Sequence, residues 1–371
     1  MAEFIKGMDI STLIEEEACG AKYFDDGVEG DLLEILKKYG TNSVRLRLWN
    51  DPYDENGTPY GAGTNDLEKT ITLAKRAKAL DMSVLLDLHY SDFWADPGKQ
   101  IVPKAWQGMS VDELEQAVYD FTLDTMKAME EAGVYPELVQ VGNELTNGLL
   151  WPTGKKPEFD NIAKYISAGI RAIKETDKIY GKRTRIMIHL DNGGLNDMYR
   201  EWFDNYVKRG EDFDIIGMSY YPFWHGTIDE LEFNMNDMAK RYGKEIVIAE
   251  ISMGFTMEDY AQYEKTDERK GMATRPELLE KLTYPMTKQG QCDFLQDVLT
   301  RLKNVNGGGA GVGFYYWEPG WVPVPGCGWA TDEALAYTGE KGPGGNEWAN
   351  QALFDYDGNA LPALKTIKDF E

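Results

Sequence analysis

Two glutamates that end apolar runs are the residues of this chain best placed for chemistry. The run Leu138–Glu144 ends in Glu144, and the run Glu245–Glu250 ends in Glu250. Runs rich in Val, Leu and Ile without polar alternation are typical of parallel strands buried on both faces. Burying a carboxylate at the end of such a strand costs free energy, so a glutamate found there is expected to have a role. Side chains alternate along a strand, so Glu144 is expected to face away from Asn143.

A pair of carboxylic acids in one cleft can divide the work of glycoside cleavage. If their surroundings drive the two pKa values apart, one acid protonates the leaving oxygen. The other, as a carboxylate, attacks the anomeric carbon or activates a water. The alternative is that Glu144 and Glu250 are rim residues held in structural ion pairs. Finding two such residues on a repeated strand pattern favours the catalytic interpretation.

Eight strand-like runs alternate with helical patterns over the whole length. Eight β-then-α units predict a single (β/α)₈ TIM barrel, an α/β fold, with residues 1–371 as one catalytic domain. We find no G-x-G-x-x-G or P-loop motif. Long loops are expected after the third, seventh and eighth strands, at Tyr90–Gly108, Ile251–Gln289 and Glu318–Asn346. The strands are expected at Phe4–Ile10, Ser43–Trp49, Ser83–His89, Leu138–Glu144, Arg185–Leu190, Phe213–Tyr220, Glu245–Glu250 and Gly311–Trp317.

Polar and aromatic residues gather near the ends of these otherwise apolar strands. In a barrel, the last inward residue of each strand faces the mouth, so these side chains are expected to converge there. Tyr220 and Arg45 could donate hydrogen bonds to Glu250 and keep it ionised. Arg45 could equally be a structural cation beneath the site. Trp317 offers a flat face for a sugar ring, and the loop residues Trp94, Trp106 and Trp224 could stack on further sugars or belong to the core.

The composition limits the kinds of molecule that this chain is expected to bind. A net charge of −24 argues against nucleic acid and anionic lipid and suits a neutral polysaccharide. No apolar stretch is long enough for a membrane helix, and the N-terminus lacks a signal-peptide pattern. We therefore expect a cytoplasmic chain, or a trimmed form of a secreted one. Three cysteines predict no disulfide framework, and three histidines without a ligand motif predict no metal or other cofactor.

Several motifs, in order along nearly the whole chain, resemble glycoside hydrolase family 53. They are Gly7–Ser11, Val44–Trp49, Leu88–Pro97, Val141–Glu144, Ser219–Pro222, the Glu250 strand and Tyr316–Pro319. The resemblance implies an endo-β-1,4-galactanase acting on galactan with retention of configuration, with Glu144 as acid/base and Glu250 as nucleophile. Together, the motifs and strand ends give the expected substrate-binding residues Asp9, Arg45, His89, Asp92, Trp94, Asp96, Trp106, Asn143, His189, Tyr220 and Trp317.

Three points stay open at this level. Met257–Arg275 lacks the Asp/Asn-rich pattern of a calcium loop that bacterial relatives often carry after strand seven. Another retaining clan A β-glycanase, acting on mannan, xylan or glucan, would share the glutamate pair, and only the segment His89–Pro97 argues for galactan. A carbohydrate-binding barrel without catalysis is the third possibility, although both glutamates are in place.

Overall fold

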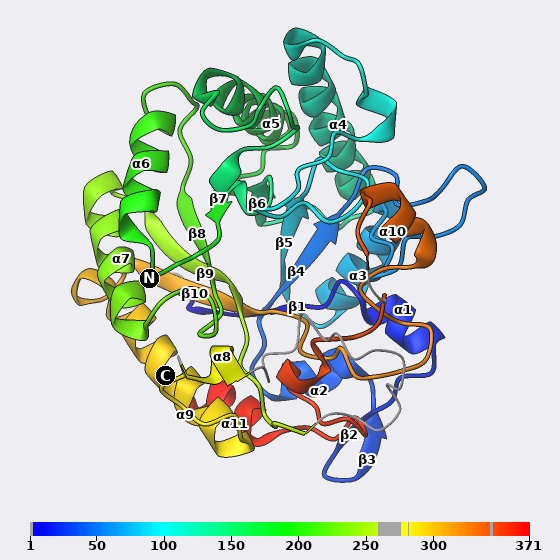
Figure 1. Ribbon diagram of the computed structural model, residues 1–371, viewed down its shortest axis with the longest axis vertical. Helices are drawn as coiled ribbons and strands as arrows, with labels where there is room; N and C mark the ends of the chain where they lie inside the picture. The colour runs from blue at the N-terminus through cyan, green and yellow to red at the C-terminus, as the bar shows by residue number, and fades with distance from the viewer. Residues whose placement is uncertain (1–2, 259–275, 281, 342–343) are drawn as a thin grey trace.

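The computed structural model describes residues 3–258, 276–280, 282–341 and 344–371 (Figure 1). Its centre is a closed barrel of eight parallel strands in the order β1-β10-β9-β8-β7-β6-β5-β4, with β4 pairing back to β1. The barrel predicted from the sequence is therefore confirmed. The strands are β1 (Ile5–Asp9), β4 (Ser43–Leu48), β5 (Ser83–Leu88), β6 (Leu138–Val141), β7 (Arg185–Leu190), β8 (Ile215–Tyr220), β9 (Glu245–Ile251) and β10 (Gly311–Tyr316).

Helices surround the barrel, as Figure 1 shows. Two of them start at the capping boxes that the sequence predicts, Ser110 with Glu113 and Thr227 with Glu230. A short hairpin of β2 (Tyr23–Asp25) and β3 (Val28–Gly30) was not predicted. The helices are α1 (Leu13–Ala18), α2 (Leu32–Lys38), α3 (Leu67–Ala79), α4 (Val111–Glu131), α5 (Phe159–Tyr180), α6 (Asn196–Tyr206), α7 (Ile228–Tyr242), α8 (Pro276–Leu279), α9 (Lys288–Lys303), α10 (Asp332–Thr338) and α11 (Pro362–Asp369).

The interior of the barrel is apolar at one end and polar at the other. The apolar layer consists of Ile5, Leu85, Leu138, Met187, Ile215, Val247, Ala249 and Tyr315. The next inward residues toward the carboxyl ends include Asp9, Arg45, Asp87, Gln140 and His189, all fully buried. The apolar layer closes the barrel as a packed core, so the polar layer serves as the floor of whatever binds at the mouth.

Two of the long loops meet above one side of the barrel. The loop after β5 contains a 3₁₀ turn at Lys104–Trp106, and the loop after β10 contains α10. The Lys104 ammonium lies 5.3 Å from the centre of the Tyr337 ring on α10, and the Tyr337 hydroxyl donates to Asp92 at 3.5 Å. These contacts hold α10 beside the loop after β5, as Figure 1 also shows.

Most of Met257–Arg275 lies outside the described residues, so the expectation about a calcium loop stays a prediction. None of the helices in the described ranges combines the length and apolar character needed to cross a bilayer.

Candidate active site

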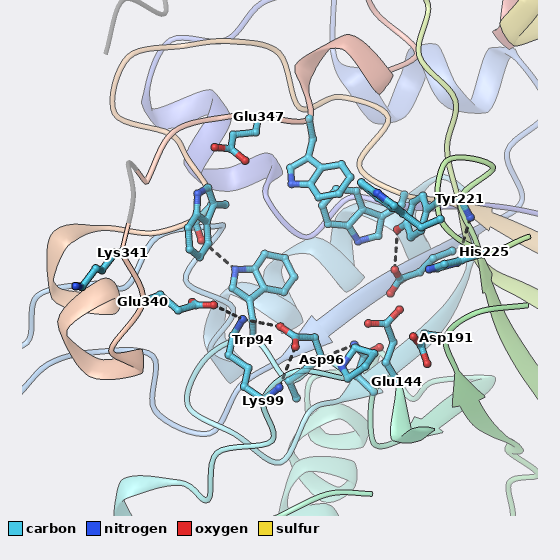
Figure 2. A pocket seen from close by; sticks show the side chains of 18 residues that line it. Trp94, Asp96, Lys99, Glu144, Asp191, Tyr221, His225, Glu340, Lys341 and Glu347 are labelled. Atoms are coloured by element: carbon cyan, nitrogen blue, oxygen red, sulfur yellow. Dashed lines mark hydrogen bonds and ion pairs between the residues drawn. The ribbon is translucent and has the colours of Figure 1, made fainter. Parts of the chain in front are cut away.

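A pocket of about 610 Å³ opens at the carboxyl ends of the barrel strands (Figure 2). Its lining combines acidic side chains with many indole rings. Flat apolar ring faces together with carboxylates are groups that can hold a sugar and act on it. The lining residues are Trp94, Ala95, Asp96, Pro97, Lys99, Asn143, Glu144, Asp191, Tyr221, Trp224, His225, Glu250, Trp317, Trp329, Glu340, Lys341, Glu347 and Trp348.

Glu144 reaches this pocket because β6 ends three residues before it. After Val141, both Gly142 (φ +82°) and Glu144 (φ +47°) adopt left-handed backbone conformations, and Leu145–Asn147 form a 3₁₀ turn. Strand alternation therefore stops, and Asn143 and Glu144 both line the pocket instead of facing opposite sides. Non-glycine residues at positive φ are strained, and such strain clusters at functional sites.

A β-bulge in β9 turns Glu250 into the same pocket. Along β8, Met218 pairs with Ile248, but the next residue, Ser219, pairs with Glu250, which leaves Ala249 as the extra residue. Without the bulge, Glu250 would share the outward face with Ile248, because side chains alternate along a strand. Bulges next to active sites commonly re-aim a side chain in this way.

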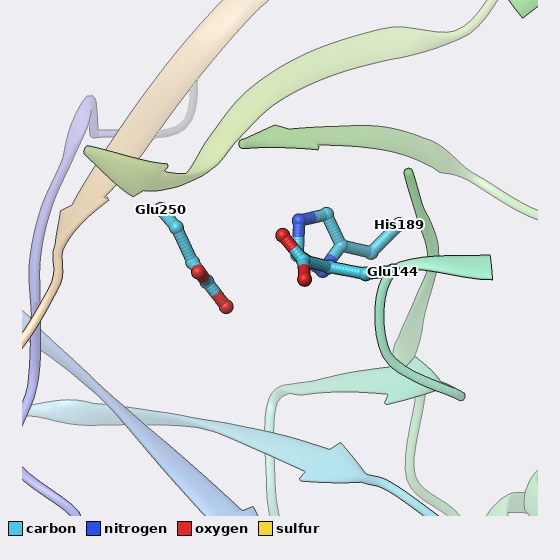
Figure 3. A group of neighbouring side chains, drawn as sticks. All are labelled: Glu144, His189 and Glu250. Carbon is cyan, nitrogen blue, oxygen red and sulfur yellow. The ribbon is translucent and has the colours of Figure 1, made fainter. Parts of the chain in front are cut away.

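The two carboxyl groups face each other across the pocket, with His189 beside Glu144 (Figure 3). One carboxylate oxygen of Glu144, one of Glu250 and a ring nitrogen of His189 all lie within 4.8 Å of one another. Carboxyl groups of retaining glycosidases lie about 5–5.5 Å apart, whereas inverting enzymes leave about 6.5–9.5 Å for a water. Oxygens that come within 4.8 Å of each other fit a retaining pair.

Glu250 is surrounded by groups that stabilise its ionised form. The Tyr221 hydroxyl donates to Glu250 Oε2 at 2.7 Å, and Arg45 Nη2 lies 2.9 Å from Oε1. Burial raises the pKa of Glu250, and the Arg45 charge and the Tyr221 hydrogen bond oppose that rise. The pKa of Glu250 is still raised overall, but these two contacts limit the rise.

Glu144 lies among negative charges instead. Burial, the charge of Glu250 and the charge of Asp191 raise its pKa well above the ordinary value of 4.5. The Ser219 hydroxyl donates to Glu144 Oε1 at 2.7 Å and acts against this rise. Asp191 also accepts a hydrogen bond from Thr146 in the turn after Glu144. The surroundings therefore favour a protonated Glu144 and an ionised Glu250, the division that glycoside cleavage needs.

Arg45 is fixed beneath the pair by a buried network. It donates from Nη1 to Asp9 at 2.7 Å, and from Nη2 to Asp87 at 2.8 Å and to Asn143 Oδ1 at 2.9 Å. These partners compensate the buried guanidinium and hold Nη2 beside Glu250. Arg45 is thus a structural cation and also the ion-pair partner of Glu250.

A second arginine supports the aromatic side of the pocket. The Arg47 guanidinium lies 4.5 Å from the centre of the Trp94 ring, and its Nη2 lies 2.6 Å from Glu318 Oε1. Thr12 donates to the other oxygen of Glu318 at 2.5 Å. Burial raises the pKa of Glu318 to about 7, although Arg47 opposes the rise. Arg47, which is itself fixed by Glu318, thus holds the Trp94 ring in place.

The structure brings six of the expected site residues together at the pocket: Trp94, Asp96, Asn143, Glu144, Glu250 and Trp317. Four others lie beneath or behind it. Asp9 and Arg45 belong to the network just described. His89 lies within hydrogen-bonding distance of Asp87 at 3.0 Å, and His189 Nε2 lies 2.8 Å from Ser219 Oγ. These four residues reach the pocket through other side chains.

Three expected residues lie elsewhere, each for a local reason. Tyr220 shares the outward face of β8, where it donates to Gly226 O at 3.1 Å and stacks on Phe294. Asp92 is buried under the loop after β5 and accepts from the Lys104 backbone N–H at 2.6 Å.

Trp106, the third, is largely buried in the same loop, with its ring 5.9 Å from that of Phe121, and it lines a second hollow instead of this pocket. Strand alternation does not apply to a loop, so the direction of the Trp106 side chain could not be predicted from it.

Trp224, which the sequence offered as a stacking ring, also lines the pocket, and several other lining residues were not predicted. Tyr221 could have been predicted from strand alternation. Alternate residues of β8 point into the barrel, namely Ile215, Gly217 and Ser219, and Tyr221 is the next in that series. Asp191 continues the parity of Met187 and His189 in the same way, one residue past β7. Trp329, Glu340 and Trp348 come from the irregular loop after β10, which has no periodic pattern to place them.

Glu144, His189 and Glu250 form the one group in the described part of the chain with a spacing that could hold a metal ion. Both ring nitrogens of His189 are already in hydrogen-bonding contacts. Nε2 lies 2.8 Å from Ser219 Oγ, and Nδ1 lies 3.0 Å from Asn143 Oδ1 and 3.1 Å from Gln140 Nε2. A cation would have to displace these contacts, so the group fits an ordered acid pair better than a metal centre.

Comparison with known proteins extends these observations. The sequence profile of glycosyl hydrolase family 53 matches residues 5–367. The endo-β-1,4-galactanase of Bacillus subtilis strain 168 is 37% identical over 385 residues, covering 99% of this chain and 86% of that protein. The solved GH53 catalytic domain of Ignisphaera aggregans has a TM-score of 0.88 and 41% identity, covering 98% and 95% of the two chains. A solved fungal β-1,4-galactanase gives a TM-score of 0.78 at 31% identity, with both chains fully covered.

Proposed function

The chain belongs to glycosyl hydrolase family 53, and from that membership we propose a retaining endo-β-1,4-galactanase that cleaves internal bonds of galactan and type I arabinogalactan. The observation that carries the proposal is the facing pair Glu144 and Glu250, at retaining distance and in opposite electrostatic surroundings. We further propose that residues 1–371 act as one catalytic domain, which the single barrel and the family match over residues 5–367 support.

In the first step, Glu250 attacks the anomeric carbon of the bound galactosyl unit. Arg45 and Tyr221 hold its carboxylate ionised and leave it facing the pocket. The protonated Glu144 gives its proton to the glycosidic oxygen as the bond to the leaving chain breaks. The galactosyl unit is then covalently bound to Glu250 in the α configuration.

In the second step, Glu144, now ionised, takes a proton from a water that attacks the same carbon. The bond to Glu250 breaks, the product leaves with β configuration, and Glu144 is protonated again. Ser219, which donates to Glu144, stabilises the ionised form that this step requires. The charge of Glu250 returns as the bond breaks, and Arg45 and Tyr221 stabilise it once more.

Aromatic rings that line the same pocket as the acids supply surfaces for the sugars. Trp317, which is 8% exposed, lies next to Trp348 and Trp94, with ring centres 5.2 and 6.2 Å away. Asp96 and Asn143 add polar groups at the same pocket. A pocket of this kind suits a neutral sugar chain, since the rings pack on its apolar faces and the polar groups bind hydroxyls.

The proposal is tested by following hydrolysis of linear β-1,4-galactan, β-mannan, xylan and β-glucan side by side, with proton NMR of the first products. We expect galactan to be cleaved fastest, with rapid loss of viscosity and the β-anomer appearing first. An initial α-anomer would refute the retaining mechanism. A preference for another polysaccharide would refute the substrate, and slow viscosity loss with early galactose would mean exo-attack.

A further inference from the structure

A second hollow, of about 550 Å³, adjoins the catalytic pocket; we call it the outer hollow. It is lined by residues 98–102 and 106–109 of the loop after β5, by Leu114, by residues 151–153 and by Thr338. Lys99 lines both the outer hollow and the catalytic pocket. Thr338 lines the outer hollow, and Glu340, two residues later, lines the pocket. The two spaces are therefore neighbours on the same face of the barrel.

The Lys99 side chain stands where the two hollows meet. Lys99 Nζ lies 2.5 Å from Asp96 Oδ2 and 3.1 Å from Glu340 Oε1. In Figure 2 these three residues lie on the side of the pocket away from Tyr221 and His225. Ion pairs of partly exposed side chains contribute little free energy, so this one can yield to a ligand. A polymer in the catalytic pocket can thus continue past Lys99.

The lining of the outer hollow fits a neutral ligand. Among its described lining residues only Lys99 is charged, and the others are apolar, glycine, amide or hydroxyl residues. A hollow of about 580 Å³ between α4, α5 and the segment after α6 shows the contrast, because seven of its nine lining residues are charged. On a chain of net charge −24, an almost uncharged hollow of ligand size next to the active site points to a neutral sugar chain.

Trp151 supplies a rigid aromatic surface in the outer hollow. Its indole N–H donates to Asn147 O at 3.0 Å, and its backbone N–H donates to Gln100 O at 2.9 Å. The Lys155 ammonium lies 4.1 Å from the ring centre, and the Trp151 side chain lines the outer hollow. A ring held in one orientation binds with little loss of conformational entropy.

We propose that the outer hollow binds the continuation of the galactan chain whose reacting bond lies between Glu144 and Glu250, with Trp151 as its main contact. The inference rests on the proposed function, because it needs galactan in the catalytic pocket. It makes the enzyme's efficiency depend on chain length, since only a chain that crosses Lys99 reaches Trp151.

The test compares Trp151→Ala with wild type on linear β-1,4-galactan and on an aryl β-galactobioside, which is too short to cross Lys99. We expect kcat/KM on galactan to fall about 2–10-fold, the range of a single aromatic contact, mainly through KM. Activity on the galactobioside should stay within twofold. Phe233→Ala is the matched control, because Phe233 is a 58% exposed aromatic residue on α7, outside both hollows.

Trp151→Phe separates sugar binding from a structural role. It keeps a flat ring but loses the bond to Asn147 O, in the turn that follows Glu144. We expect it to recover most of the activity on galactan. Unchanged kinetics on galactan for Trp151→Ala would overturn the inference, as would equal losses on both substrates for both variants. Failure of the proposed function looks different, because wild type would then cleave neither substrate.

Discussion

Tyr221→Phe isolates the hydrogen bond that keeps Glu250 ionised. The lost bond is 2.7 Å long, buried and donated to a carboxylate. Hydrogen bonds to charged groups contribute about 1.5–3 kcal/mol. Its loss should therefore lower kcat/KM on galactan about 10–150-fold. Because the bond stabilises the charged form, its removal raises the pKa of Glu250. The acid limb of the pH–kcat/KM profile should move up by about 1–2 pH units.

Tyr220→Phe is the matched control. Tyr220 precedes Tyr221, is also buried, and donates to a backbone carbonyl, Gly226 O, rather than to an acid. It should lower stability by about 0.5–1.5 kcal/mol and leave the acid limb unchanged. Melting temperatures of both variants and pH profiles of their kcat/KM on galactan provide the measurement. A large kinetic effect of Tyr220→Phe with a near wild-type Tyr221→Phe would refute the assignment of β8 parity.

Two further variants should move the alkaline limb, which reports the protonated acid, in opposite directions. Ser219→Ala removes a donor that lowers the pKa of Glu144, so the limb should move to higher pH, by up to about one unit. Asp191→Asn removes a negative charge that raises the same pKa, so the limb should move to lower pH. Shifts of the same sign in both variants, read from pH–kcat/KM profiles, would contradict the account of Glu144.

Much of the fold follows from local sequence. The eight strands were predictable because a parallel strand buried on both faces is a continuous apolar run bounded by breakers. Helix starts such as Ser110 and Thr227 were predictable because a capping box is a local arrangement of two side chains. The polar ends of the strands then indicated the mouth of the barrel, and Glu144 and Glu250 both lie there.

The directions of individual side chains were less predictable. Strict alternation fails at Gly142, where the backbone turns left-handed, and at the bulge that pairs Ser219 with Glu250. Strand alternation also gives the wrong side chain when the wrong residue is taken to point inward. Tyr220 was expected at the mouth of the barrel, but Tyr221 lies there. A bulge or a positive φ depends on pairing with the neighbouring strand, which a single sequence does not show.

The side chains of the loops are the part of the site that the sequence predicts least well. Trp94 lies at the pocket, whereas Trp106, in the same loop, is buried against Phe121. Nothing in their types or spacing separates them, because the loop has no regular period. Its contacts with α10, in the loop after β10, are long-range and become visible only in the fold.

The central claim, that Glu144 is the acid/base and Glu250 the nucleophile, is tested most directly by azide rescue of Glu144→Ala and Glu250→Ala on an aryl galactobioside. Each change should lower turnover on galactan by several orders of magnitude, because each removes a unique chemical role. A good leaving group needs no proton, so Glu144→Ala should keep more activity on the aryl substrate. Azide should rescue that variant and give a β-galactosyl azide, identified by NMR. Near wild-type turnover in either variant, or a β-azide from Glu250→Ala instead, would contradict the assignment.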